Sequence, residues 1–125
     1  MTQRLTIPGR LPGYNQLTTG HWARRNRVKR EALELVGWEI RRQRIMPVCG
    51  RATVRIVCYE PNRKRDPSNV RAGAEKVILD ALQECGIIRG DGWAWLDDVP
   101  AAVTVDRRAE RVEVRIEDAN QETQD

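Results

Sequence analysis

The stretch Arg63–Asp91, RKRDPSNVRAGAEKVILDALQECGIIRGD, organises the chain. Asp66-Pro67 predicts a helix start, because an Asp side chain can accept hydrogen bonds from free backbone amides and proline fits the first helical position. Apolar residues then recur at helical spacing, and Gly86 predicts the helix end, since glycine tolerates the left-handed conformation found there. The pattern therefore predicts one helix with an acid before it and an acid after it.

The composition is that of one small globular domain. The chain has 125 residues, of which 40% are apolar and 32% are charged, so 1–117 can form a single core but not two. From residue 118 onward the apolar pattern stops, and 118–125 is predicted to be a disordered tail. No apolar run reaches the length of a membrane span, so no membrane partner is expected.

Cysteine usage indicates a reducing compartment. Cys49, Cys58 and Cys85 lie far apart and form no C-x-x-C pair, which favours buried thiols over disulfides or structural zinc. The N-terminus also lacks the apolar region of a signal peptide. We therefore expect a cytoplasmic protein.

Apolar periodicity outside the central stretch predicts a second helix and four strands. A further apolar piece, 93–96, carries two tryptophans at strand spacing, which are more often core or subunit-interface residues than DNA contacts. The fold class is thus α+β, a small, largely antiparallel sheet with two main helices. The second helix is expected at 21–44, and the strands at 4–7, 52–59, 99–106 and 111–117.

A segment rich in glycine and proline, 8–15, follows the first strand. The plainer interpretation is a surface connection, which the composition favours. The alternative is a preformed loop that presents Tyr14, Asn15 and backbone amides to a ligand. Both interpretations stay open at this point.

Basic residues gather in two places. Five lie in the first half of the 21–44 helix, where cations oppose the helix dipole, and three more precede Asp66. Basic side chains that work against local stability are better candidates for phosphate contacts than for structural roles. The candidate DNA-binding residues are Asn15, Arg24, Arg25, Arg27, Lys29, Arg30, Arg63, Lys64 and Arg65.

Acids beside these basic residues suit metal-dependent phosphodiester hydrolysis. Asp oxygens bind Mg²⁺ through few protein ligands and several waters. The metal polarises the phosphate and activates water, while a lysine can neutralise charge in the transition state. The alternative is that these acids only cap a helix and carry surface charge. The residue types alone leave both alternatives open.

The stretch RKRDPSNVRAGAEKVILDALQECGIIRGDGW resembles the core signature of RusA-like Holliday-junction resolvases, most closely their phage and prophage branch. In that signature basic residues precede Asp-x-Asp-Asn, and a lysine, Asp-Ala-Leu, a glycine and a final Asp follow. IPGRLPGYN resembles the first strand and loop of the family, and VTVDRRAERVEVRIE its closing strands. The resemblance covers the chain to about residue 117.

The resemblance implies a set of site residues. Asp66 matches the first catalytic acid, Asp91 the final one and Lys76 the motif lysine, and the two acids would bind the metal. Asn69 and Asp80 match supporting positions of the motif. The family implies a homodimeric endonuclease, dependent on Mg²⁺ or Mn²⁺, that cuts four-way DNA junctions in recombination and repair. A junction with two-fold symmetry suits a dimer with two active sites.

Ser68 stands where the family has its second acid. A hydroxyl is a weaker, neutral Mg²⁺ ligand, so one negative charge is missing. The consequence is either weakened metal affinity, compensation by Asp97 or Asp98, or a protein that binds junctions but cuts them poorly; Ser68 can also simply support the helix start. A further alternative is an unrelated basic DNA-binding regulator, which would prefer linear duplex.

Bringing Asp66 and Asp91 to one metal is geometrically tight. A helix from about Asn69 to Cys85 runs ~25 Å at roughly 1.5 Å per residue. The extended stretch 86–91 reaches at most ~20 Å. Closure becomes easier if 69–73 is loop-like, or if Asp91 serves the site of the other subunit across a dimer.

Overall fold

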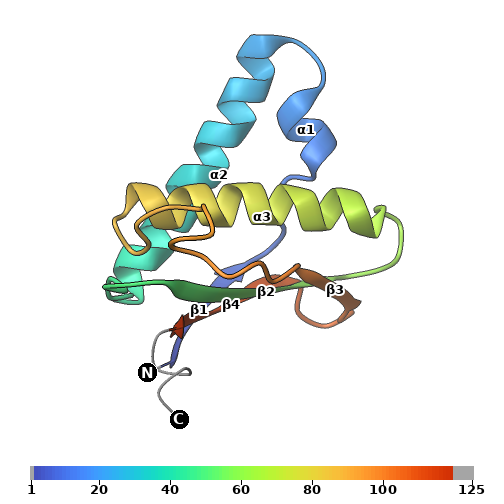
Figure 1. Ribbon diagram of the computed structural model, residues 1–125. Helices are drawn as coiled ribbons and strands as arrows, with labels where there is room; N and C mark the ends of the chain where they lie inside the picture. Colours follow the sequence, from blue (N-terminus) through green and yellow to red (C-terminus); the bar gives the residue numbers. More distant parts are fainter. Residues whose placement is uncertain (1, 120–125) are drawn as a thin grey trace.

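The computed structural model describes residues 2–119 and places three helices on one face of a four-stranded sheet (Figure 1). The architecture is α+β, as the sequence predicts. Two of the helices are long, and the third is a short helix of 5 residues that the sequence did not indicate. The elements are β1 (Thr2–Pro8), α1 (Tyr14–Thr18), α2 (Trp22–Arg42), β2 (Ala52–Glu60), α3 (Pro67–Glu84), β3 (Ala102–Val105) and β4 (Arg111–Asp118).

The strand order in the sheet is β1-β4-β2-β3. β4 lies between β1 and β2 and runs antiparallel to both, while β3 is an edge strand parallel to β2. The sheet is therefore mixed, with two antiparallel pairs and one parallel pair. The chain passes from β3 to β4 without making them neighbours, because β2 separates them.

One face of the sheet forms the core with α2 and α3. Alternate residues of the three long strands are almost fully buried there: Leu5 and Ile7, Ile56 and Cys58, Val114 and Ile116. α3 contributes Val77, Ile78 and Leu82, which are also fully buried. Burying one aliphatic side chain stabilises the fold by about 1.5–3 kcal/mol. This packing fixes the position of α3 and of the side chains on its exposed sides.

The predicted start and stop of α3 are confirmed. The Asp66 carboxylate accepts a hydrogen bond from the Asn69 amide at 3.1 Å, and Pro67 occupies the first turn. Gly86 follows the last turn with a φ of 72°, a left-handed conformation that costs glycine little. The helix is continuous through 69–73, so this segment is not the loop that would make it easier to bring Asp66 and Asp91 to one metal.

Three local predictions need correction. The expected loop 8–15 runs into α1, whose start is capped by the Gln16 side chain, 2.9 Å from the Gly13 amide. The tryptophans of the piece 93–96 were expected in a core or a subunit interface; the piece forms a turn in which Trp93 is 88% exposed, and only Leu96 packs against the core. The strand expected at 99–106 shortens to β3, because only 102–105 pairs with β2.

The C-terminal boundary also differs from the prediction. β4 continues through Asp118, and Ala119 is buried, with its amide donating to the Arg51 carbonyl at 2.9 Å. Both residues were expected in the disordered tail, yet sheet pairing holds Asp118 and the backbone hydrogen bond to Arg51 holds Ala119. The remainder of that predicted tail, 120–125, lies outside the described residues.

The three cysteines are free, as predicted, but they are not all buried. Cys58 is buried, and this burial, with a smaller effect of the Glu60 charge, raises the pKa of its thiol to about 11. Cys85 is half-buried and Cys49 is exposed. Within residues 2–119, no helix combines the length and the apolar composition needed to cross a membrane.

Candidate functional site

The predicted site residues fall into three groups along α3. One group surrounds Asp66 at the N-terminus of the helix. A second surrounds Asp80 on the side that faces α2. The third surrounds Asp91 in a cavity beside the middle of the helix.

At the N-terminus of α3, the chain itself uses the Asp66 carboxylate. Ser68 Oγ donates a hydrogen bond to Asp66 Oδ2 at 2.5 Å, and the Asn69 amide donates to the same oxygen at 3.1 Å. These hydrogen bonds, that of Ser68 first, hold the pKa of Asp66 below its usual range. Asn69 Oδ1 in turn accepts from the Asn15 amide at 2.8 Å. Asp66 Oδ1 makes no hydrogen bond with the described part of the chain and stays available to a cation.

The loop 8–15 packs directly against α3, and Gly73 makes this possible. A Cβ at this position would lie 2.2 Å from the Pro12 carbonyl oxygen and 2.8 Å from Gly13 Cα. Any side chain at Gly73 would therefore push the loop away. The exposed Tyr14 follows directly after this contact. The packing favours the interpretation of a preformed loop over that of a loose connection.

Asp80 forms ion pairs with two lysines, one from α3 and one from α2. Its Oδ2 lies 3.4 Å from Lys76 Nζ, one turn earlier on α3, and 3.5 Å from Lys29 Nζ on α2. The Lys76 side chain is 50% exposed, so its ammonium can still reach a ligand. Ion pairs at such exposure contribute little stability, and their main effect here is on where the two lysines point. The structure thus brings together three of the predicted residues.

Asp91 lines a cavity of about 230 Å³ beside α3. The walls come from α3, from β2 and from the segment 91–99, which returns alongside them. Within the described residues, three of the acids at this cavity make no hydrogen bond and no ion pair, so their carboxylates are available to a ligand. The acidic residues that line it are Glu75, Asp91, Asp97 and Asp98.

Asp97 is the acid of this cavity that has partners. Its Oδ1 lies 3.0 Å from Arg51 Nε, and its Oδ2 accepts a hydrogen bond from Thr53 at 2.6 Å. These contacts tie the segment 91–99 to the start of β2. Asp98 is exposed and unpaired, so it is the better candidate of the two for a compensating acid.

Glu75 was not among the predicted site residues. It directly precedes Lys76 in the sequence, which is the only local signal that could have drawn attention to it. Glu75 becomes a candidate site residue only because the segment 91–99 folds back beside the helix and forms the cavity with it. That return is a property of the tertiary structure and has no periodicity in the sequence.

The donor set of the cavity fits a hard cation such as Mg²⁺ or Mn²⁺ in its chemistry. Mg²⁺ prefers oxygen ligands and commonly takes one or two carboxylates, several waters and substrate phosphates. Among residues 2–119, no three His, Cys, Asp or Glu side chains are grouped closely enough to hold an ion by themselves. A cation in this cavity would therefore complete its coordination with water and phosphate oxygens.

Asp66 does not line the Asp91 cavity. Glu75, which does, lies nine residues after Asp66. That separation is ~14 Å along the helix axis at roughly 1.5 Å per residue. Asp66 and Asp91 therefore do not share a cavity in this conformation.

The predicted phosphate contacts differ in how free their side chains are. Arg25 donates to the Thr18 carbonyl at 3.2 Å and so joins α1 to α2, and Lys29 is paired with Asp80. Five others are exposed and their side chains make no hydrogen bond or ion pair with the described part of the chain: Arg24, Arg27, Arg30, Arg63 and Lys64. These five are the side chains best placed to meet a polyanion.

Arg65 has a structural role instead. Its Nε and Nη2 donate to the two carboxylate oxygens of Glu60, each at 2.8 Å, and its Nη1 donates to the Leu11 carbonyl at 3.0 Å. Arg10 adds a hydrogen bond to Glu60 at 2.9 Å. Burial alone would raise the pKa of Glu60, but the hydrogen bonds from Arg65 and Arg10 outweigh it and hold this pKa below its usual range. The network fixes the connection that leads into α3.

No protein-family model matches the chain, and no curated protein matches it. The likeness to RusA-like resolvases therefore stays a prediction that rests on the motif residues themselves.

Proposed function

We propose that this protein is a metal-dependent endonuclease that cleaves branched DNA, with the four-way junction as its substrate. The observation that carries the proposal is the Asp91 cavity, where three carboxylates have no partner in the described chain. Within residues 2–119, none of these three carboxylates makes a contact that holds the fold together, so all three remain available to a cation. The motif resemblance and the exposed arginines of α2 are independent support.

Each residue of the site has a role in the proposed reaction. Asp91 would hold the cation together with Glu75 or Asp98. A bound Mg²⁺ or Mn²⁺ would supply polarisation of the phosphodiester and a bound water of lowered pKa. Lys76, positioned by Asp80, would place its ammonium against the phosphate oxygens, where negative charge grows in the transition state.

A homodimer would give the proposed enzyme two such sites, one for each of two symmetry-related strands of a junction. It would also give Asp66 a place in the chemistry. Its Oδ1 has no partner in the described chain, so it could complete the coordination of a cation held by Asp91 of the second subunit.

DNA would approach along the exposed basic side chains of α2 and of the segment before Asp66. Contacts of this kind go to phosphates and carry little sequence information. Affinity should then fall steeply as salt rises, and each lost phosphate contact should flatten the log–log slope by roughly 0.9. Measuring junction affinity of Arg27→Gln across a salt series checks this; an affinity that does not depend on salt would contradict it.

Cleavage of a synthetic four-way junction tests the proposal. We expect nicking with Mg²⁺ or Mn²⁺, none with EDTA, and much less on linear duplex of the same sequence. Asp91→Asn should still bind the junction but cut it at least ~100-fold more slowly, since a metal ligand supplies several kcal/mol of charge stabilisation. Glu84→Gln, an exposed change at the far end of α3, is the matched control and should cut normally. Full cleavage by Asp91→Asn would overturn the assignment.

A junction-binding protein that does not cut is the second candidate. The observation that favours it is Ser68, whose hydroxyl donates to Asp66 and so serves the helix start rather than a metal. Tight, metal-independent junction binding without nicking in either Mg²⁺ or Mn²⁺ would support it. Preference for linear duplex over the junction would instead favour a basic DNA-binding regulator.

A further inference from the structure

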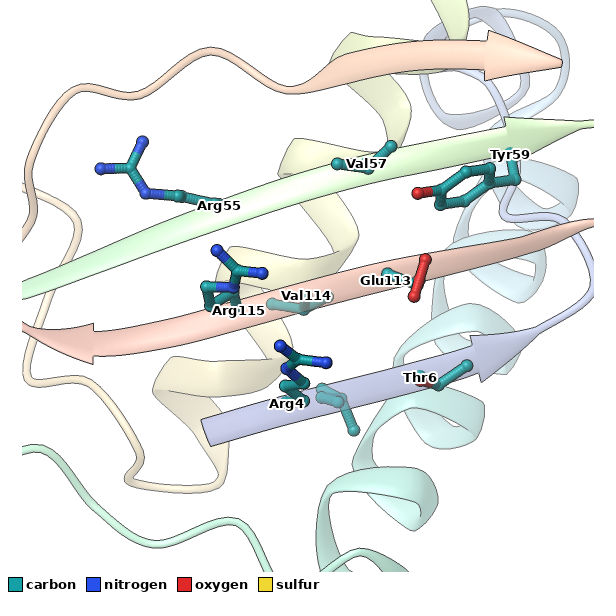
Figure 2. A pocket seen from close by; sticks show the side chains of 9 residues that line it. Arg4, Thr6, Arg55, Val57, Tyr59, Glu113, Val114 and Arg115 are labelled. Carbon is teal, nitrogen blue, oxygen red and sulfur yellow. The ribbon is translucent and has the colours of Figure 1, made fainter. Parts of the chain in front are cut away.

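The face of the sheet opposite the helices carries a row of three arginines. Arg4 of β1 pairs in register with Arg115 of β4, and Arg115 pairs in register with Arg55 of β2. All three are exposed, and Figure 2 shows their side chains next to one another across the three strands. Neighbouring strands lie about 4.8 Å apart, so the row concentrates three positive charges within ~10 Å.

Within residues 2–119, no acid forms an ion pair with this arginine row. Glu113 lines the same hollow of about 250 Å³, but its carboxylate lies 3.5 Å from Arg111 Nε. Glu117, two residues after Arg115 on β4, is half-buried and makes no ion pair with the row. Like charges directly opposite each other in a sheet are destabilising. The row is therefore a cost to the fold that an external anion would relieve.

We propose that the arginine row is a second phosphate-contact surface, which binds the backbone of a DNA segment other than the one that α2 contacts. The identity of this polyanion as DNA rests on the proposed function. The planar guanidinium group binds phosphate through two parallel hydrogen bonds, which makes arginine well suited to this role. A row without internal partners leaves all three guanidinium groups free for such bonds.

The position of the row explains why it would hold a separate segment. α2 rises above the helical side of the molecule, whereas the row lies on the uncovered side of the sheet (Figure 1). The two surfaces face away from each other across the core. A branched DNA presents more than one duplex arm, so one protomer could contact two arms at once.

Charge favours DNA over an acidic protein as the occupant of this face. The chain has a net charge of +4, and its other exposed basic residues, on α2 and before Asp66, share the same chemistry. A continuous row of cations matches the regular charge of a phosphate backbone, which carries a negative charge every ~3.4 Å along one strand. A protein partner would have to supply several carboxylates at the same close spacing.

The test uses Arg115→Gln, the centre of the row, with Arg107→Gln as a matched control. Arg107 is exposed in the β3–β4 connection, so its change removes the same charge elsewhere. Junction affinity is measured across a salt series without metal, and Tm is measured in the same buffers without DNA. We expect Arg115→Gln to flatten the salt slope by roughly 0.9 and to raise Tm, because repulsion within the row is relieved. The control should change the slope less and leave Tm unchanged.

The outcomes separate this inference from the proposed function. If Arg27→Gln flattens the slope but Arg115→Gln does not, the inference is overturned and the proposed function stands. If the wild-type protein binds no DNA at low salt, both fall. A lower Tm for Arg115→Gln would mean that the row has a structural role. Altered self-association in sedimentation, with an unchanged salt slope, would assign the face to a second copy of the chain. Each of these two results would overturn the inference.

Discussion

The two acids that bracket α3, Asp66 and Asp91, stand in opposite electrostatic situations. Asp66 accepts two hydrogen bonds from its own chain, and these lower its pKa. Asp91 has no partner in the described chain and shares its cavity with other carboxylates. Helix capping fully accounts for an Asp at position 66. Asp91 is exposed and the fold does not use its carboxylate, so it is the acid that remains free for a ligand.

The prediction with the largest expected effect tests whether the metal site is built within one subunit or shared by two. We expect Asp66→Asn and Asp91→Asn each to be inactive alone, and their mixture to recover junction nicking. About half of randomly re-formed dimers would be mixed, and each would hold one intact site, so recovery should reach about a quarter of wild-type activity. The measurement is nicking after the two variants have been co-refolded.

The mixture needs one control and has one contrary outcome. Co-refolding two preparations of Asp91→Asn should recover nothing. If the mixed variants also stay inactive while they do form dimers, the two acids belong to the same subunit, and the separation of Asp66 from the Asp91 cavity would have to close on DNA binding.

Metal binding should be visible in stability and should depend on Asp91 more than on Asp66. A ligand that binds only the folded state at ten times its Kd stabilises it by about 1.4 kcal/mol. We expect Mg²⁺ or Mn²⁺ to raise the Tm of the wild-type protein and of Glu84→Gln, and to leave the Tm of Asp91→Asn unchanged. Thermal melts over a metal titration provide the measurement, and an equal rise for Asp91→Asn would place the cation elsewhere.

Ser68→Asp should have a smaller effect, with a sign that depends on metal. Without metal, the new carboxylate lies beside Asp66 and replaces the hydroxyl that donates to it, so Tm should fall. With Mg²⁺ the restored carboxylate should strengthen metal binding and raise junction cleavage. Cleavage and Tm against Mg²⁺ concentration check both parts. A poorer metal response than wild type would mean that another acid, such as Asp98, already fills the position.

The smallest effect is expected for the pH dependence of Asp66. Its pKa in the folded protein lies below the ordinary value of 3.8. Its contribution to stability is therefore fully present above pH ~4 and is lost as pH falls through the lowered pKa. Asp66→Asn keeps a good helix cap but cannot ionise, so its stability should lack this component. Urea denaturation of both proteins between pH 2 and about pH 6 gives the free energy of unfolding at each pH. Plotted against pH, the two free energies should converge at the acid end. Parallel plots would contradict the prediction.

Local signals in the sequence predicted the elements that lie close to the candidate site. The Asp66-Pro67 start and the Gly86 stop of α3 are chemical properties of those residues, so they could be read without knowing the fold. The alternation in β2 and β4 likewise follows from strands with one buried face. Arg65 is the counterexample: it was grouped with its basic neighbours, although Glu60 and the Leu11 carbonyl hold it within the fold.

The sequence by itself determined where α3 begins and ends, and which acids flank it, because capping and apolar periodicity act over a few residues. Only the tertiary structure decided that the segment 91–99 returns beside α3 and brings Asp91 to Glu75. It alone also decided that the strand order places Arg115 between Arg4 and Arg55. Both arrangements join residues that are far apart in the chain, and such contacts follow from the packing of the whole core rather than from local pattern.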